Sequence, residues 1–412
     1  MLKITCEGVY YKNGGFVPAK DGPAAGLPAP EKAREGTMAH AILKAHNTGD
    51  NMEELAIRFD AMASHDITYV GIIQTARASG MQAFPLPYVL TNCHNSLCAV
   101  GGTINEDDHV FGLSAAKKYG GEVVPAHQSV IHSYMRERYA APGRMILGSD
   151  SHTRYGAYGT MAIGEGGPEL ARQLLSKTYN IPYPKVIAIY LTGTPIPGVG
   201  PQDVALELIR STFKDGVVKN AVMEFFGPGV ANLSMDYRSG IDVMTTETTC
   251  LSSIWETDET THRFLAVHGR AADYKKLAPA DLAYYDGVVE VDLSAIRPMI
   301  ALPMHPSNAF TIEELNANLE DILHACEQDV QKLIGRKDVS LDLCSKIENG
   351  KLRVDQGVIA GCAGGLYDSI YEAASILKGH TGGCGDYALS VSPGSQPIMM
   401  ELVRTGVIGE LM

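Results

Sequence analysis

Short hydrophobic runs alternate with longer amphipathic segments along most of the chain. The clearest runs cover residues 145–147, 186–191 and 288–293, and they have the length and apolar character of strands. The segments 201–213 and 368–377 are predicted to be helices. Strands that alternate with helices in this way predict an α/β fold with mainly parallel sheets.

Three further helices are predicted from the residues at their ends. Thr37 is a suitable N-cap for a helix over 38–45, and Thr311 with Glu314 forms a capping box ahead of a second helix. The segment 51–62 carries acidic residues in its first turn and is predicted to be the third.

Two seams near Pro184 and Pro298 divide the chain into three parts. We therefore predict three domains, over residues 1–184, 185–296 and 297–412.

Composition and charge narrow the classes of function. Of the 412 residues, 45% are hydrophobic and 20% are charged, which is typical of globular proteins. The formal net charge is -13 with no block of Lys and Arg, so we expect no nucleic-acid partner. No apolar stretch is long enough to span a membrane, and the first residues lack a secretory signal. The scattered cysteines do not form a disulfide scaffold, so we expect a cytoplasmic protein with reduced thiols.

Polar residues follow several predicted strands, where the ligand crevice of an open α/β sheet lies. The candidates are Cys93, His94, His132, Asp150, Ser151, His152, Glu224 and Cys362. Each also has an ordinary structural explanation. A lone histidine is more often a hydrogen-bonded structural residue, and Asp150 with Ser151 suits a helix cap or a turn. Glu224 could be a solvated carboxylate, and Cys362 could fill a core.

Taken together, the candidates suit the removal of water from a hydroxy acid. That reaction needs a base for the carbon-bound proton, an acid for the leaving hydroxyl, and a Lewis acid or cation for the substrate oxygens. Histidines backed by carboxylates supply tunable proton donors, and thiolates can hold an iron–sulfur cluster as the Lewis acid.

The segment 142–153 reads Pro-Gly-Arg-Met-Ile-Leu-Gly-Ser-Asp-Ser-His-Thr and resembles the signature of the aconitase and isopropylmalate isomerase family. Further similar stretches, in an order that matches the family, are 131–132, 164–167, 185–193, 224–230, 359–362 and 392–395. The resemblance implies an α/β fold with a three-domain α/β/α sandwich core and a swivelling fourth domain. It also implies a [4Fe-4S] cluster with one open iron site.

The resemblance also assigns roles to the matched residues. It implies catalytic roles for His94, His132, Asp150, His152 and Glu224, substrate binding by His65 and Ser151, and Cys362 as a cluster ligand. In particular, Glu224 matches the carboxylate that supports His152.

The chain departs from the family at its end. The other two cluster cysteines of the family form a Cys-x-x-Cys loop downstream of the turn at 392–395, and the sequence ends at Met412 without such a pair. We expect a third domain that is truncated, no fourth domain, and no intact cluster in this chain alone. A companion chain that completes the site is the alternative, and Cys93 or Cys384 as replacement ligands is a weaker one.

Two substitutions affect the expected chemistry. Cys93 stands where the family has an aspartate before the histidine matched by His94, which predicts a less basic His94. His65 stands where the family has a glutamine in its substrate pocket, which points away from citrate as the substrate.

The leading prediction is therefore a hydro-lyase that acts on a small carboxylated hydroxy acid through a [4Fe-4S] cluster in its complete form. The alternative is a cluster-free binding or regulatory module. A nucleotide-binding enzyme is disfavoured, because the sequence has no phosphate-binding Gly-x-x-x-x-Gly-Lys-Ser/Thr loop.

Overall fold

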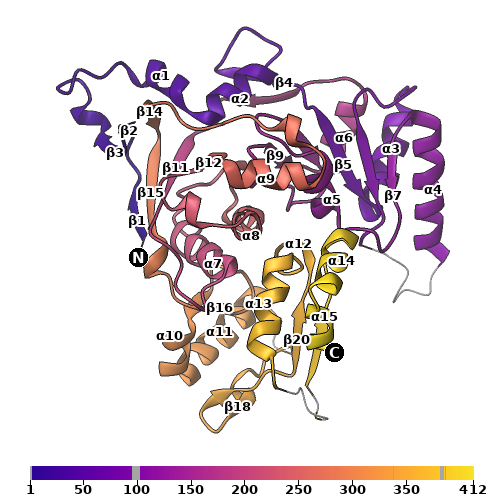
Figure 1. Ribbon diagram of the computed structural model, residues 1–412, viewed down its shortest axis with the longest axis vertical. Coiled ribbons are helices and arrows are strands. Elements are labelled where there is room, and N and C mark those ends of the chain that lie inside the picture. Colours follow the sequence, from indigo (N-terminus) through magenta and orange to yellow (C-terminus); the bar gives the residue numbers. More distant parts are fainter. Residues whose placement is uncertain (1, 95–102, 337, 381–384, 386) are drawn as a thin grey trace.

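Two five-stranded sheets form the centre of the molecule (Figure 1). The structure, a computed structural model, describes residues 2–94, 103–336, 338–380, 385 and 387–412. The first sheet is wholly parallel, in the order β7 (Glu122–Val124), β6 (Tyr88–Thr91), β5 (Ala61–His65), β8 (Met145–Gly148) and β9 (Met161–Gly164). The second has the order β1 (Leu2–Thr5), β15 (Gly287–Asp292), β11 (Val186–Thr192), β12 (Val222–Phe226) and β13 (Ser252–Trp255), and only β1 runs antiparallel to its neighbour.

Helices connect the strands and cover the sheets. Before the last third of the chain they are α1 (Pro30–Ala33), α2 (Met38–His46), α3 (Asp66–Ala78), α4 (Thr103–Tyr119), α5 (Ile131–Arg138), α6 (Gly167–Leu174), α7 (Pro201–Thr212), α8 (Met235–Met244) and α9 (Glu259–Val267). The predicted α/β fold with mainly parallel sheets is confirmed.

The sheets are buried on both faces. Alternate residues of β8 enter different hydrophobic clusters, since Met145 and Leu147 pack in one and Ile146 packs in the other. In β11, Ala188 joins the cluster of Met145, and Ile189 joins that of Ile146. Each cluster therefore contains residues of both sheets, and near-continuous apolar strands are what such two-sided burial requires.

The N-terminal strands join strands of the part predicted as residues 185–296, β1 in the second sheet and β2 (Val9–Lys12) and β3 (Gly15–Pro18) in a separate three-stranded sheet. Strand β1 pairs with β15, and the hairpin of β2 and β3 pairs with β14 (Leu282–Tyr285). The part predicted as residues 1–184 therefore contributes a strand to the sheet of the part predicted as 185–296.

The helix predicted over 51–62 is wrong. The segment forms strand β4 (Glu54–Ile57) and the start of β5, and β4 pairs with β10 (Tyr179–Pro182). Leu55 and Ile57 are buried on alternate positions, which is the period of a strand. The helix predicted at Thr37 is confirmed, because the Thr37 side chain accepts a hydrogen bond from the His40 backbone.

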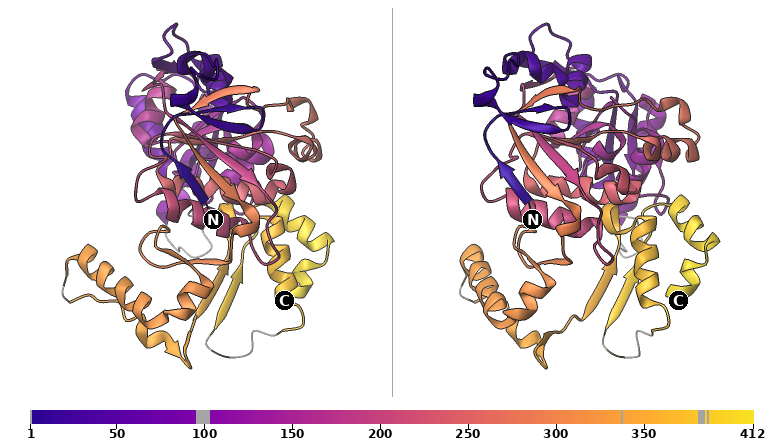
Figure 2. Two further views of the ribbon diagram at one scale, coloured as in Figure 1. Left: turned by 90° about the vertical axis from the view of Figure 1, so that its left-hand side faces the viewer. Right: turned by 60° about the vertical axis from the view of Figure 1, so that its left-hand side comes forward.

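The last third of the chain lies below the sheets in Figure 1, and both views of Figure 2 agree. Its helices are α10 (Ile312–Ala317), α11 (Leu319–Ile334), α12 (Gly361–Gly364), α13 (Tyr367–Leu377), α14 (Gln396–Arg404) and α15 (Val407–Leu411). Its strands are β16 (Met299–Ala301), β17 (Ala309–Thr311), β18 (Ile347–Glu348), β19 (Lys351–Leu352), β20 (Gln356–Ile359) and β21 (Ala388–Val391). The capping box of Thr311 and Glu314 is confirmed, but the helix that it begins breaks at Asn318. Across the described ranges, the helices are too short or too polar to cross a bilayer.

Candidate active site

Three neighbouring strands of the first sheet end at one edge and bring polar side chains together. His65 is the last residue of β5, His94 follows β6, and Asp150 follows β8. Because the strands are parallel and lie in the order β6-β5-β8, their carboxyl ends meet. His132 reaches the same point from the first turn of α5.

Asp150 is the centre of this group. Its Oδ1 accepts a hydrogen bond of 2.7 Å from the backbone N–H of His152 and lies 3.1 Å from Nε2 of His132. Its Oδ2 lies 3.3 Å from Nε2 of His94 and 3.7 Å from Nε2 of His65. We call these five residues the Asp150 cluster. The structure thus brings together five of the residues predicted from the sequence.

The shared carboxylate is held in its charged form. Burial alone would raise the pKa of Asp150, but hydrogen bonds from His132, His152 and His94 outweigh it and lower that pKa well below its usual range. In return, the hydrogen bond to Asp150, with a further one to Cys93, raises the pKa of His94 to about 10.

The pKa values of the other three imidazoles shift in opposite directions. The hydrogen bond to Asp150 also raises the pKa of His152, whereas burial lowers the pKa of His65 and of His132 to about 4 in each case. Near neutral pH the cluster therefore holds a charged His94, which can donate a proton, beside the neutral His65 and His132.

The carboxylate that supports His152 is Glu247. Its Oε1 lies 3.1 Å from Nε2 of His152, and it belongs to the short helical turn η5 (Thr245–Thr248) after α8. The prediction that Glu224 supports His152 is wrong, because Glu247 occupies that position.

Glu224 instead has a structural position in β12. Its side chain is fully buried and accepts hydrogen bonds from the backbone N–H groups of Met38 and Ala39 and from the hydroxyl of Tyr285. Burial raises the pKa of Glu224 to about 7, although these three donors oppose the shift. The carboxyl group therefore anchors the start of α2 to the second sheet.

Ser151 and Cys362 lie at the margin of the cluster. Ser151 is exposed, with its Oγ 3.3 Å from Nδ1 of His152. Cys362 belongs to α12, and its carbonyl accepts a hydrogen bond of 2.9 Å from Arg136 of α5. Burial raises the pKa of the Cys362 thiol, and the nearby Asp150 adds to the shift.

The sequence comparisons agree with this geometry. The model of the Aconitase family (aconitate hydratase) matches residues 40–412. The chain belongs to the aconitase family. It is 28% identical over 400 residues to "Aconitate hydratase, mitochondrial" of Saccharomyces cerevisiae, a match that covers 90% of this chain and 48% of the relative. It is 28% identical over 303 residues to "3-isopropylmalate dehydratase large subunit 2" of Archaeoglobus fulgidus, which covers 73% of this chain and 64% of the relative. The chain spans about half the length of the aconitate hydratases that it matches.

The structure shows the surroundings of Cys93, which stands where the aconitase family has an aspartate. Cys93 places its Sγ 3.3 Å from Nδ1 of His94, where an aspartate was expected. A buried carboxylate is nevertheless close, because Oδ1 of Asp66 lies 3.9 Å from the same nitrogen and accepts hydrogen bonds from the backbone N–H groups of Cys93 and His94. That His94 is less basic than its family counterparts stays a prediction, but the thiol is not its sole partner.

The described residues do not supply a full ligand set for the cluster of the aconitase family. Cys362 joins no group of three or more potential metal ligands in the ranges that the structure describes. Cys98 and Cys384, the second of which was a weak candidate for a replacement ligand, lie outside these ranges. One matched thiol does not suffice to hold an iron–sulfur cluster.

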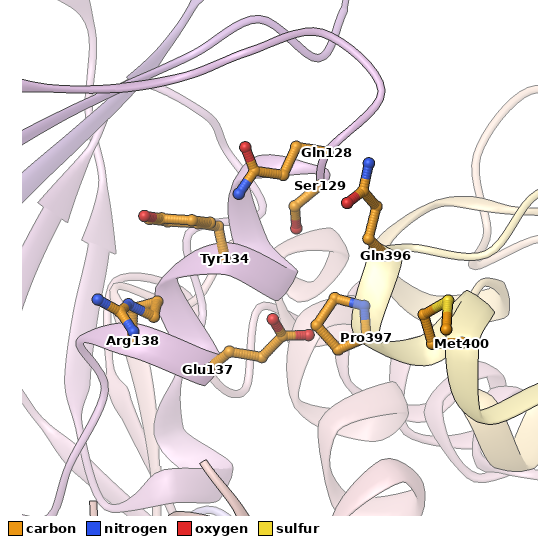
Figure 3. Close-up of a pocket in the computed structure, with 8 residues that line it drawn as sticks. All are labelled: Gln128, Ser129, Tyr134, Glu137, Arg138, Gln396, Pro397 and Met400. Carbon is orange, nitrogen blue, oxygen red and sulfur yellow. The ribbon is translucent and has the colours of Figure 1, made fainter. Parts of the chain in front are cut away.

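A hollow of about 510 Å³ lies between α5 and α14 (Figure 3). Its walls include Tyr134 and Glu137 on one side and Gln396 and Met400 on the other, but no member of the Asp150 cluster. This hollow is therefore separate from the Asp150 cluster.

Proposed function

We propose that the complete protein is a hydro-lyase that removes water from, or adds it to, a small carboxylated hydroxy acid. The observation that carries the proposal is the Asp150 cluster, in which one carboxylate contacts both charged and neutral imidazoles at the carboxyl edge of a parallel sheet. The names of the relatives, aconitate hydratase and 3-isopropylmalate dehydratase, support the same reaction class.

The two kinds of imidazole suit the two proton transfers of a dehydration. A charged His94 can protonate a leaving hydroxyl. The buried His132 is neutral, and its ring nitrogens lie 3.1 Å from Asp150 and 3.1 Å from the hydroxyl of Tyr155, so a proton would reach it through one of these groups. His152 lies between the carboxylates of Asp150 and Glu247, which raise its pKa and favour its charged form. Ser151 and His65 are proposed to contact the substrate.

We derive no step through an iron–sulfur cluster, because the described residues supply one matched thiol. In the complete protein, Cys362 would be one ligand, and a further segment or a companion chain would supply the others. The name "large subunit" of the isopropylmalate dehydratase relatives supports the second arrangement. A cytoplasmic location stays a prediction, since the yeast relative is named as mitochondrial.

The test uses the complete gene product, purified without oxygen, beside the 412-residue chain. Iron and acid-labile sulfide are measured, and hydration of α,β-unsaturated di- and tricarboxylic acids is followed by the loss of their ultraviolet absorbance. We expect hydration by the complete protein and a loss of at least a hundredfold in His132→Asn. If the complete protein, after reconstitution with iron and sulfide, hydrates none of these acids, the proposal fails and the binding-module alternative replaces it.

A further inference from the structure

Three members of the Asp150 cluster present potential metal-ligand atoms to one point. His65, His94 and Asp150 each offer one ligand atom, and these three atoms all lie within 4.8 Å of one another. The residues come from the ends of three adjacent strands, so the sheet fixes the spacing of their backbones. The side chains are sheltered, with exposed fractions of 8%, 35% and 13%.

The spacing is close to what a small metal ion requires. Bonds of about 2.0–2.2 Å to nitrogen and oxygen place neighbouring ligand atoms roughly 3.0–3.4 Å apart. The Asp150 oxygen is 3.3 Å from the nitrogen of His94 and 3.7 Å from that of His65. The two rings lie with centroids 3.9 Å apart and are tilted by 35°. The two rings would have to turn apart from this close arrangement for both Nε2 atoms to face one ion.

Surrounding contacts already orient two of the three ligands. The second oxygen of Asp150 is held by the backbone of His152 and the ring of His132, which leaves Oδ2 facing His65 and His94. The other ring nitrogen of His94 faces the sulfur of Cys93. Outer contacts of this kind are what fix the orientation of metal ligands in proteins.

We propose that His65, His94 and Asp150 bind one divalent first-row transition metal ion, such as Zn²⁺ or Fe²⁺. Two histidines and one carboxylate with open positions are a recurrent ligand set for such ions. The site depends on His65, which stands where the aconitase family has a glutamine. It therefore belongs to this chain and not to the family pattern.

Two other groups of potential ligands occur in the described residues. Asp66 with Cys93 and His94 shares His94 with the proposed site, but Oδ1 of Asp66 already accepts from the backbone N–H groups of Cys93 and His94. His324 with Glu327 and Cys344 is a poorer candidate. The His324 side chain is 63% exposed, and Oε1 of Glu327 is already occupied by the backbone N–H groups of Leu343 and Cys344. This group provides a control for binding to surface ligands.

The inference deepens the proposed function, on whose site it rests, by giving the chain a Lewis acid of its own. An ion there would leave coordination positions open for the carboxylate and hydroxyl oxygens of a hydroxy acid. Binding would require His94 to release its proton, and the ion would then take over from His94 the stabilisation of the leaving hydroxyl. His152 would remain available as a proton donor. Metal binding is measured without any reaction, so its failure is distinguishable from failure of the proposed function.

The test titrates the chelator-treated 412-residue chain with Zn²⁺ and Co²⁺ by calorimetry and visible absorption. We expect one tight site, weakened at least tenfold in His65→Gln and unchanged in His324→Gln and in the exposed His262→Gln. A binding curve that is the same in His65→Gln and the unaltered chain overturns the proposal, as does the absence of binding.

Because His65 is buried, its replacement could disturb folding, and a second measurement avoids the variant. In the unaltered chain, substoichiometric Co²⁺ should shift or broaden the imidazole NMR signals of His65 and His94 before that of His324. Perturbation of the His324 signal first would overturn the proposal.

Discussion

Asp150 shows how one charge can set the protonation of several neighbours. Its carboxylate lies between histidines that differ in burial, and the more exposed His94 gains a proton while the buried His132 loses one. A second carboxylate, Glu247, lies 3.1 Å from the other ring nitrogen of His152, closer than the 3.9 Å between Asp66 and His94. The charge of His152 therefore depends on two acidic residues from different parts of the chain.

This arrangement predicts that Glu247→Gln lowers the pKa of His152, whereas Glu224→Gln leaves it unchanged. Asp150 is the largest cause of the raised pKa and remains in the variant, so we expect the pKa of His152 to fall without losing the whole of its upward shift. Because folding raises this pKa, the charged His152 stabilises the native state below about pH 6.5, and that contribution is lost as the pH rises through the folded pKa. An NMR titration of His152 in both variants measures the shift. An equal shift in Glu224→Gln would restore the pairing first predicted from the sequence.

The sequence could predict that residues shortly after neighbouring strands share a site. It could not predict a site residue that lies far from these strands in the sequence. His94 and Asp150 follow apolar runs directly, so the edge that they share follows from parallel pairing. Glu247 stands 95 residues from its partner His152, and its surroundings carry no periodic pattern that would identify it. Tertiary structure alone brings these two together.

At the scale of elements, Glu224 shows a buried acid used as a helix anchor. Its two oxygens accept from the first two residues of α2, where N–H groups lack partners within the helix. A negative charge is favourable there, but full burial opposes it.

Strand β4 shows where a local sequence pattern failed to predict the element. Its acidic start suggested a helix, yet pairing with β10 makes it a strand.

Glu224 also predicts a pH dependence of stability. Folding raises its pKa from 4.5 to about 7, so the native state binds the proton more tightly than the unfolded chain. The free energy of unfolding should therefore fall by up to about 3 kcal/mol as the pH rises from 4.5 to 7, and then level off. Glu224→Gln should remove this slope, at a cost of about 1–3 kcal/mol at low pH because its amide cannot accept from both backbone groups. Denaturant unfolding at pH 5 and pH 8 measures both effects, with the exposed Glu372→Gln as control. A slope that persists in Glu224→Gln would show that another group causes it.

At the scale of the whole molecule, the two parts of the chain differ in how they are packed. Both sheets share the two large hydrophobic clusters, whereas the last third depends on smaller ones around Leu323 and Ile370. Polar contacts at several points, with a small apolar cluster of Leu206, Met299 and Ala309, join that third to the rest. Ser395 donates to the buried Glu137, and the backbone N–H of Val130 donates to the carbonyl of Gly394. Arg136 likewise donates a hydrogen bond to the carbonyl of Cys362.

This difference predicts that the last third opens before the sheets unfold. Local opening is easiest where few apolar groups are buried, so backbone amides of α11 and α13 should exchange with solvent at least tenfold faster than those of β8 and β11. Glu137→Gln should increase the difference, because it weakens the contact with Ser395, and should leave β8 and β11 unchanged. Hydrogen exchange followed by mass spectrometry on the 412-residue chain measures both. Equal protection across these four elements would mean that the chain unfolds as one cooperative unit, and α12 would then hold Cys362 as firmly as the sheets hold the Asp150 cluster.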